Sequence, residues 1–211
     1  MAPDAPSRPS EPPSIADAIG GPWGVAETSA PAAAFVVAYS ISGSDTDTAA
    51  TVAIALALVL AAIRLARRQS PRHAISGLIG VAFAAFVATR SGRAEDFFLP
   101  GLITNALFIT ALLVSIAVRR PLVGIIVSQL DGEGHRWRED PARSRTFTRA
   151  SWLWAGLFSM RLLVQLPLYL AGAVVALGVA RTAMGVPLFA LGVWLTWLLV
   201  RRPPAPAAAG A

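Results

Sequence analysis

The chain has 211 residues, of which 55% are hydrophobic and 14% are charged. Its mean hydropathy of +0.60 lies well outside the range of a water-soluble domain of this length. A net charge of +6 would suit a nucleic-acid-binding protein. The arginines, however, stand beside apolar stretches, where membrane orientation and anionic lipid headgroups explain them. We therefore expect a membrane protein that contacts anionic headgroups, with no nucleic-acid partner.

Cysteine is absent, and all 18 basic residues are arginine. A chain without cysteine has no disulfide, no thiol nucleophile and no thiolate metal ligand. The exclusive use of arginine, with abundant alanine, glycine and proline, indicates a bacterial protein from a GC-rich genome. We expect a multi-pass protein of the bacterial inner membrane.

Both ends of the chain differ in composition from its centre. Residues 1–22 are rich in proline and in small or polar residues, which cannot bury enough apolar surface to fold. We expect a disordered cytoplasmic tail there rather than a signal peptide, because a basic start followed by an unbroken apolar region is missing. Residues 203–211 are expected to form a second disordered tail. The membrane domain is therefore residues 23–202.

Six apolar segments in this domain are predicted to be transmembrane helices, because a helix satisfies its own backbone hydrogen bonds in lipid. The apolar stretch 152–200 is too long for one span of about 20 residues, so a break is expected near residues 181–185. Residues 121–130 are too short to cross and should be interfacial or re-entrant, within a cytoplasmic loop at 119–150. The predicted fold class is an all-α, six-span bundle, with helices at 25–41, 48–65, 73–89, 97–118, 152–180 and 186–200.

Three apolar stretches end at an arginine pair with a proline close behind, at residues 67–68, 119–120 and 201–202. Basic residues are retained on the cytoplasmic side of a membrane, and proline ends a helix that has left it. If the N-terminus is inside, 14 arginines are cytoplasmic and three are outside: Arg90, Arg93 and Arg181. This bias predicts that both termini are cytoplasmic, as an even number of spans requires.

Arg161 is the one arginine predicted to lie deep within a span, where a charge is costly unless it is paired, hydrated or functional. Gln165 and Tyr169 follow at i+4 and i+8, which predicts a polar stripe facing the bundle interior. One interpretation is that the stripe lines a path for a solute or ion. The other is that Arg161 is a structural clamp that bonds neighbouring helices.

Two further polar residues are candidates for the same site. Asn105, eight residues into the fourth predicted span, should lie near the level of Arg161. Glu27 is the only acidic residue within a predicted span, but it lies close to the cytoplasmic end. We expect Asn105 near Arg161, and Glu27 near cytoplasmic arginines or at a cytoplasmic vestibule. Asn105 could instead serve only as an interhelical hydrogen-bonding residue.

No cofactor, metal site or catalytic constellation is predicted. Four acids and one histidine cluster in the long loop, but they are interleaved with arginines and lack the fixed spacing of metal ligands. No serine or acid stands at a fixed spacing from either histidine, so no nucleophile and base emerge. We expect no enzyme. The loop residues in question are Asp131, Glu133, His135, Glu139 and Asp140.

Three segments carry a family resemblance: residues 92–101 with Asn105 following, residues 120–124, and Ser151-Trp152 leading to Arg161. They resemble an uncharacterised actinobacterial family of polytopic membrane proteins, a family of domains of unknown function. The resemblance to the bacterial septation protein A group is more distant. The resemblance to the uncharacterised family covers roughly residues 20–202 and implies an inner-membrane bundle of five or six spans. It implies no substrate and no catalytic residue.

Two functions follow as hypotheses. The leading one is permeation or transport of a small solute or ion along Arg161, Gln165, Tyr169 and Asn105. The alternative is a non-transporting envelope or division factor that acts through its cytoplasmic loop, as the septation resemblance suggests. The bilayer is one expected partner. The sequence does not decide whether a second copy of the chain or an envelope protein is another.

Overall fold

A computed structural model describes residues 21–67, 71–130 and 140–200, and in these residues the regular structure is entirely helical. The predicted tails and the acidic cluster at 131–139 lie outside the described residues, apart from the first helical turn at Gly21. The elements in chain order are α2 (Gly21–Ile41), α3 (Thr46–Ala66), α4 (Pro71–Ser91), the 3-10 helix η1 (Ala94–Phe98), α5 (Leu99–Ala117), α6 (Leu122–Leu130), α7 (Pro141–Leu170), α8 (Val174–Ala183) and α9 (Val186–Val200).

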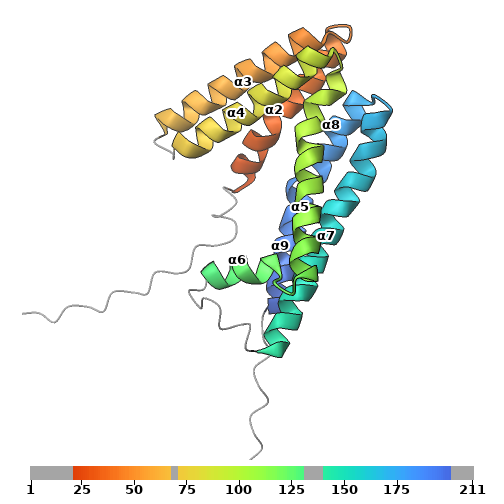
Figure 1. The fold of residues 1–211 in the computed structure, drawn as a ribbon. Coiled ribbons are helices and arrows are strands. Elements are labelled where there is room, and N and C mark those ends of the chain that lie inside the picture. The colour runs from red at the N-terminus through yellow and green to blue at the C-terminus, as the bar shows by residue number, and fades with distance from the viewer. Residues whose placement is uncertain (1–20, 68–70, 131–139, 201–211) are drawn as a thin grey trace, which may run out of the picture.

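The first three helices form one arm of the molecule (Figure 1). α3 packs against α2 on one side and against α4 on the other. The α2–α3 turn uses two residues with positive φ, Gly43 at 73° and Ser44 at 71°. Asp45 then caps α3, because its carboxylate accepts hydrogen bonds from the backbone N–H groups of Asp47 and Thr48. The side-chain hydrogen bond from Thr48, followed by the backbone bonds, lowers the pKa of Asp45.

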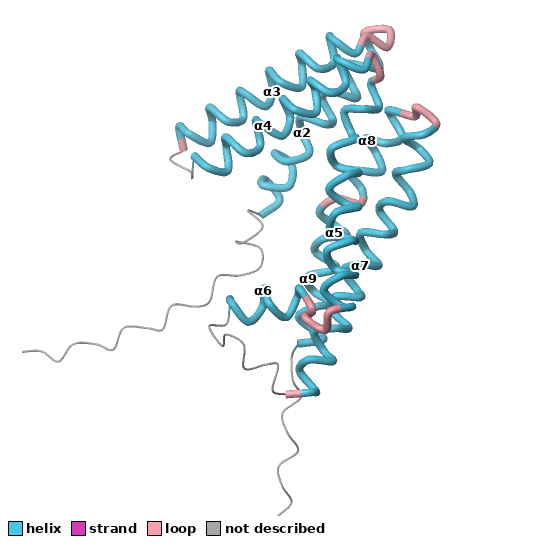
Figure 2. The backbone as a smooth tube through the Cα atoms, in the orientation of Figure 1, coloured by secondary structure: helices cyan, strands magenta, loops and turns pink. Residues whose placement is uncertain are grey.

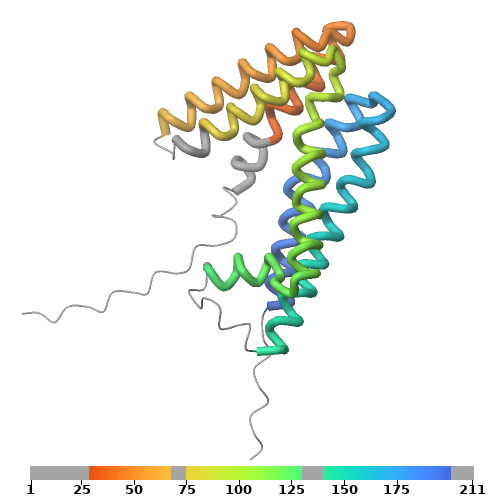
Figure 3. Tube along the Cα trace, viewed as in Figure 1, coloured from red at the N-terminus to blue at the C-terminus, as the bar shows by residue number. Residues whose placement is uncertain are grey.

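The second arm is built from α5, α7 and the α8–α9 pair, which Figure 3 shows running alongside one another. The short helix α6 projects sideways from the lower part of this arm, as Figure 2 shows, and it packs on α7. Part of the predicted loop at 119–150 is therefore helical. α7 also begins eleven residues earlier than predicted, because Asp140 caps it by accepting from the backbone N–H groups of Ala142 and Arg143, with Pro141 as its first residue.

Two apolar cores join the helices. The larger core connects the two arms at one end through α2, α3, α4, η1 and α8, with Phe35 and Phe97 stacked at a centroid distance of 4.0 Å. Alanines of α3 and α4 let these two helices approach closely, as expected for helices that pack through small residues. The smaller core, built around Leu112, Val123 and Ala155, holds α5, α6 and α7 together at the other end.

The turn between the last two predicted spans lies ten residues earlier than the sequence predicted. α7 ends at Leu170, and the turn is Ala171-Gly172-Ala173. Gly172 has φ of 65°, and the N–H of Ala173 donates to the carbonyl of Leu168, which is the hydrogen-bond pattern of a glycine-terminated helix. The predicted break near residues 181–185 is only a short interruption between α8 and α9.

Moving this turn also moves Arg181, which the sequence placed at the outer face. It lies seven residues into α8, within an apolar segment that runs from Val174 to Val200. By the helical rise this is about 10 Å from the turn. Arg181 is therefore inside a helix and not in the turn between the last two predicted spans, because the helix-ending residue is Gly172.

Four helical segments in the described residues are long and apolar enough to cross a membrane: Thr46–Ala66, Ala94–Ala117, Pro141–Leu170 and Val174–Val200. The apolar parts of α2 and α4, Ser29–Ile41 and Ile75–Ser91, are shorter. An all-helical fold with apolar helices is thus found, whereas six spans are not established. Many large apolar side chains point outward, including Leu163 at 74% exposed and Leu107 at 64%.

The contact between α8 and α2 depends on a glycine. A β-carbon at Gly178 would overlap the side chain of Val36, a β-branched residue that has little freedom to move away. We expect Gly178→Ala to destabilise the protein by about 1–3 kcal/mol, because overpacking a close contact strains its neighbours. The measurement is the midpoint of thermal unfolding in detergent. Gly156→Ala is the control, since a β-carbon there meets nothing within 4 Å, and equal midpoints for both variants would contradict the contact.

Candidate functional site

A cavity of about 1300 Å³ lies between the two arms. Both apolar cores contribute to its walls, through Ala84 and Phe97 at one end and Leu112 and Val123 at the other. The lining is mostly apolar, with a small number of polar side chains. Among the side chains that the structure describes, the charged ones that line it are all arginines: Arg64, Arg161 and Arg181. The side chain of Glu27 on α2 is not among those described.

Arg161 and Gln165 of α7 both line this cavity. Gln165 is only 3% exposed, and its Nε2 atom has no hydrogen-bond partner among the described residues. The Nε atom of Arg161 is likewise buried and without a partner there. Buried polar atoms are nearly always hydrogen-bonded, and leaving one unpaired costs about 1–3 kcal/mol. This pair of unpaired donors distinguishes the cavity from an ordinary packing gap.

Arg181 enters the same cavity from α8. Its guanidinium lies over the Phe98 ring, 5.9 Å from the centroid, and it occupies the space that a side chain at position 101 would fill. Arg161 and Arg181 thus bring two positive charges to the walls of one cavity. Arg181 was predicted in a turn and not as a site residue. The feature that could have identified it is Gly172, a helix-ending glycine that places Arg181 inside α8.

Asn105 of α5 lines the cavity together with Arg161 and Gln165, and it is 8% exposed. It lies six residues into its helix, about 9 Å from the start. Arg161 lies nine residues from the end of α7, about 14 Å from the turn. Three helices thus bring polar side chains to a similar depth from the same end of the molecule.

Tyr169 is not among the residues that line the cavity, so the predicted stripe does not continue to it. Successive helical residues advance by about 100°, so i+4 lies 40° and i+8 lies 80° from Arg161 around the helix. That rotation takes Tyr169 away from the cavity and toward η1. Its hydroxyl donates to Asp96 at 2.5 Å.

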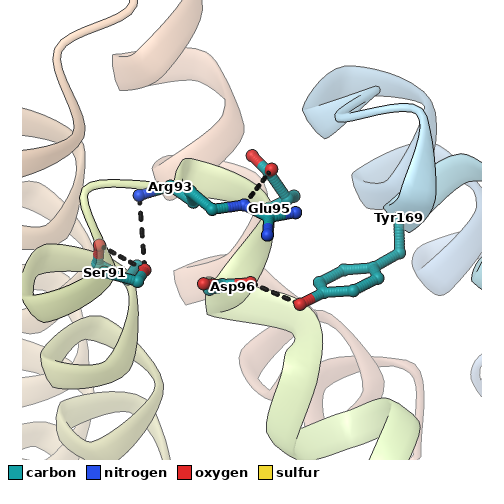
Figure 4. Close-up of polar contacts among 6 residues, drawn as sticks. Ser91, Arg93, Glu95, Asp96 and Tyr169 are labelled. Carbon is teal, nitrogen blue, oxygen red and sulfur yellow. Dashed lines mark hydrogen bonds and ion pairs between the residues drawn. The ribbon is translucent and has the colours of Figure 1, made fainter.

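Tyr169 and Asp96 belong to a polar cluster at the end of the molecule where α4 meets η1 (Figure 4). Arg93 donates to Glu95 at 2.8 Å and lies 5.7 Å from the centre of the Tyr169 ring. The hydrogen bond to Glu95, followed by the charges of Glu95 and Asp96, raises the pKa of Arg93. Asp96 is only 6% exposed, so its bond to Tyr169 fastens α7 to η1 across the buried end of the larger core.

The remaining candidates lie outside the cavity or outside the described side chains. Glu27 is part of α2, but its side chain is outside the described residues. Asp140 caps α7. The described residues contain no group of three or more histidines or acids that could hold a metal ion.

Comparison with known families assigns the chain to one of them. A profile for a family described as proteins of unknown function, DUF3159, matches residues 19–207. The chain belongs to this family. No curated protein and no solved structure matches it. The family description specifies no activity, no bacterial group and no relation to septation protein A. The cavity is therefore the feature from which a function can be proposed.

The Tyr169–Asp96 bond can be tested by substitution. We expect Tyr169→Phe to destabilise the protein by about 1–3 kcal/mol, because it leaves a buried carboxylate without its hydroxyl donor. Tyr39→Phe makes the same chemical change in the other tyrosine and should have little effect, since no described residue is shown bonding its hydroxyl. Thermal unfolding midpoints are compared in wild type and in the Asp96→Ala background. An undiminished effect of Tyr169→Phe in that background would show that the two residues are not coupled.

Proposed function

We propose that the protein is a six-span protein of the bacterial inner membrane, with both termini cytoplasmic, in which the arginine-lined cavity carries a small solute or ion across the bundle. The four long apolar helices and the outward-facing apolar side chains support the membrane part of the proposal. In this arrangement α2 and α4, each 21 residues long, supply the other two spans.

The observation that carries the proposal is that Arg161 lines a large cavity while its buried Nε atom lacks a partner among the described residues. A structural clamp would bond its neighbours, and its donors would be satisfied. An intramembrane charge that is not satisfied by nearby residues marks a substrate or ion pathway. Gln165 adds a second buried donor, and Asn105 adds a third polar side chain from a different helix.

The alternative remains a non-transporting envelope or division factor, related in role to the septation proteins. It would act through the cytoplasmic loop at 119–150, of which residues 131–139 lie outside the described residues. The two proposals differ in what each needs. Permeation needs the cavity donors and tolerates changes in the loop, whereas the scaffold needs the loop and tolerates Arg161→Gln.

Flux through reconstituted vesicles tests the leading proposal. Purified protein in proteoliposomes should take up labelled phosphate, lactate or potassium faster than empty vesicles. We expect Arg161→Gln to lower the flux by about tenfold or more, because one charge-assisted hydrogen bond is lost. Arg90→Gln makes the same change at an exposed position in the last turn of α4 and should leave flux unchanged.

Two results would contradict permeation: wild-type flux equal to that of empty vesicles for all three solutes, or equal flux for wild type and Arg161→Gln. Replacing residues 132–145 by a glycine-serine linker provides the complementary test in cells. A loss of the growth or division phenotype with the linker, but not with Arg161→Gln, would favour the envelope factor.

Water access to the cavity can be measured directly, because the chain has no native cysteine. Single cysteines at positions 105, 161 and 165 should react with a water-soluble maleimide in intact vesicles. A cysteine replacing Leu163, which is 74% exposed on the outer face of α7, should be protected by lipid. Complete protection of all three cavity positions would contradict a hydrated path.

A further inference from the structure

The charge of the cavity is of one sign. Arg161 and Arg181 both line it, and no acidic side chain that the structure describes lines it with them. Two like charges in a setting of low dielectric constant destabilise each other and the fold. An anion placed between them would remove the repulsion and replace part of the lost hydration.

The buried polar atoms without partners are also of the kind that binds an anion. Arginine and the amide nitrogen of glutamine are hydrogen-bond donors only. Both Arg161 Nε and Gln165 Nε2 are buried and unpartnered in the described part of the chain, and Gln165 is 97% buried. Donors of this kind are satisfied by the oxygens of a phosphate or carboxylate, and not by a cation.

The guanidinium of Arg181 lies between α5 and the 3-10 helix η1. It lies against Gly101, where a β-carbon would overlap it, and over the ring of Phe98. A glycine at this point leaves room for the guanidinium between α5 and α8. The two arginines therefore present donors from two helices toward one space, as a site for an oxyanion requires.

Most of the cavity is apolar and far larger than an oxyanion. Its lining includes Leu60, Val81, Phe108, Phe158, Phe189 and Val193. A volume of about 1300 Å³ exceeds the roughly 300–1,000 Å³ typical of sites for small ligands. A bare anion would leave these walls unoccupied, whereas an anion with an apolar chain would cover them.

We propose that the cavity binds an amphipathic oxyanion, with its phosphate or carboxylate group held by Arg161, Arg181 and Gln165 and its apolar chain against the aliphatic and aromatic walls. This inference rests on the proposed permeation site and names the class of solute for it. The same chemistry could come from the headgroup of an anionic lipid or from a water-soluble amphipathic anion.

Calorimetric titration of the full-length protein in a maltoside detergent, after washing to remove lipid, tests the inference with hexyl phosphate as the probe. We expect saturable binding, at least about tenfold tighter than inorganic phosphate, because the hexyl chain buries apolar surface. Hexyltrimethylammonium has the same chain and the opposite charge, and it should not bind.

The variants separate the headgroup site from general effects. Arg161→Gln and Arg181→Gln should each weaken hexyl phosphate binding by about tenfold to a hundredfold, because each removes a charge-assisted hydrogen bond. Gly101→Ala should weaken binding by displacing the Arg181 guanidinium without changing any charge. Gly156→Ala adds the same methyl group in open space and should bind like wild type.

Competition identifies the source of the anion. If phosphatidylglycerol in mixed micelles displaces hexyl phosphate and phosphatidylcholine does not, the site takes a lipid headgroup. If neither lipid displaces it, the ligand comes from water. Equal binding of hexyltrimethylammonium, equal affinity for inorganic phosphate, or unchanged affinity in Arg161→Gln and Gly101→Ala would overturn the inference, as would no binding of hexyl phosphate.

The binding experiment and the flux experiment test the two proposals separately. Hexyl phosphate binding with no flux in vesicles would support the oxyanion site and contradict permeation. Potassium flux with no hexyl phosphate binding would contradict the oxyanion site and leave permeation standing.

Discussion

Two guanidinium groups inside an apolar helical bundle are the constraint on which the rest of the structure depends. Arg161 and Arg181 come from neighbouring helices of one hairpin and line one cavity. Desolvated charges of one sign are tolerated only when something compensates them. No acidic side chain that the structure describes lines the cavity with them. A bound anion would supply such compensation, and this possibility links the fold to a function.

The two arms are arranged so that this space stays open. Their contact is concentrated at one end, where aromatic rings of α2 and η1 stack and Tyr169 bonds the buried Asp96. At the other end, α6 packs on α7 and closes the smaller core without bringing the arms together. Two glycines allow close contacts elsewhere. Gly178 lets α8 approach α2, and Gly101 makes room for the Arg181 side chain. The helices are thus closely packed at both ends of the molecule and leave a large cavity between the arms.

Sequence reasoning located part of this site. A lone arginine in an apolar stretch, with glutamine four residues later, indicated Arg161 and Gln165, because the helical period puts both on one face. The period also limits that reasoning, since by the eighth residue the side chain has rotated about 80°, and Tyr169 faces η1 instead. Arg181 was assigned to a loop because arginine, glycine and proline cluster near it. The actual turn is at Gly172, where only glycine readily adopts the required positive φ.

Composition and periodicity by themselves determined that the chain is helical and apolar, with helices long enough to cross a membrane, because those properties depend on local sequence. They also identified a costly interior charge. The depth of Asn105 in its span also predicted it near Arg161, and both line the cavity. Only the tertiary structure decided that Arg181 shares the cavity with Arg161 and that Asp96 is buried against Tyr169. The physical reason is that each of these contacts joins residues far apart in the chain, and their meeting depends on where each helix ends and how it is rotated against its neighbours. Local sequence therefore predicts helices and apolar segments well, and contacts between distant residues poorly.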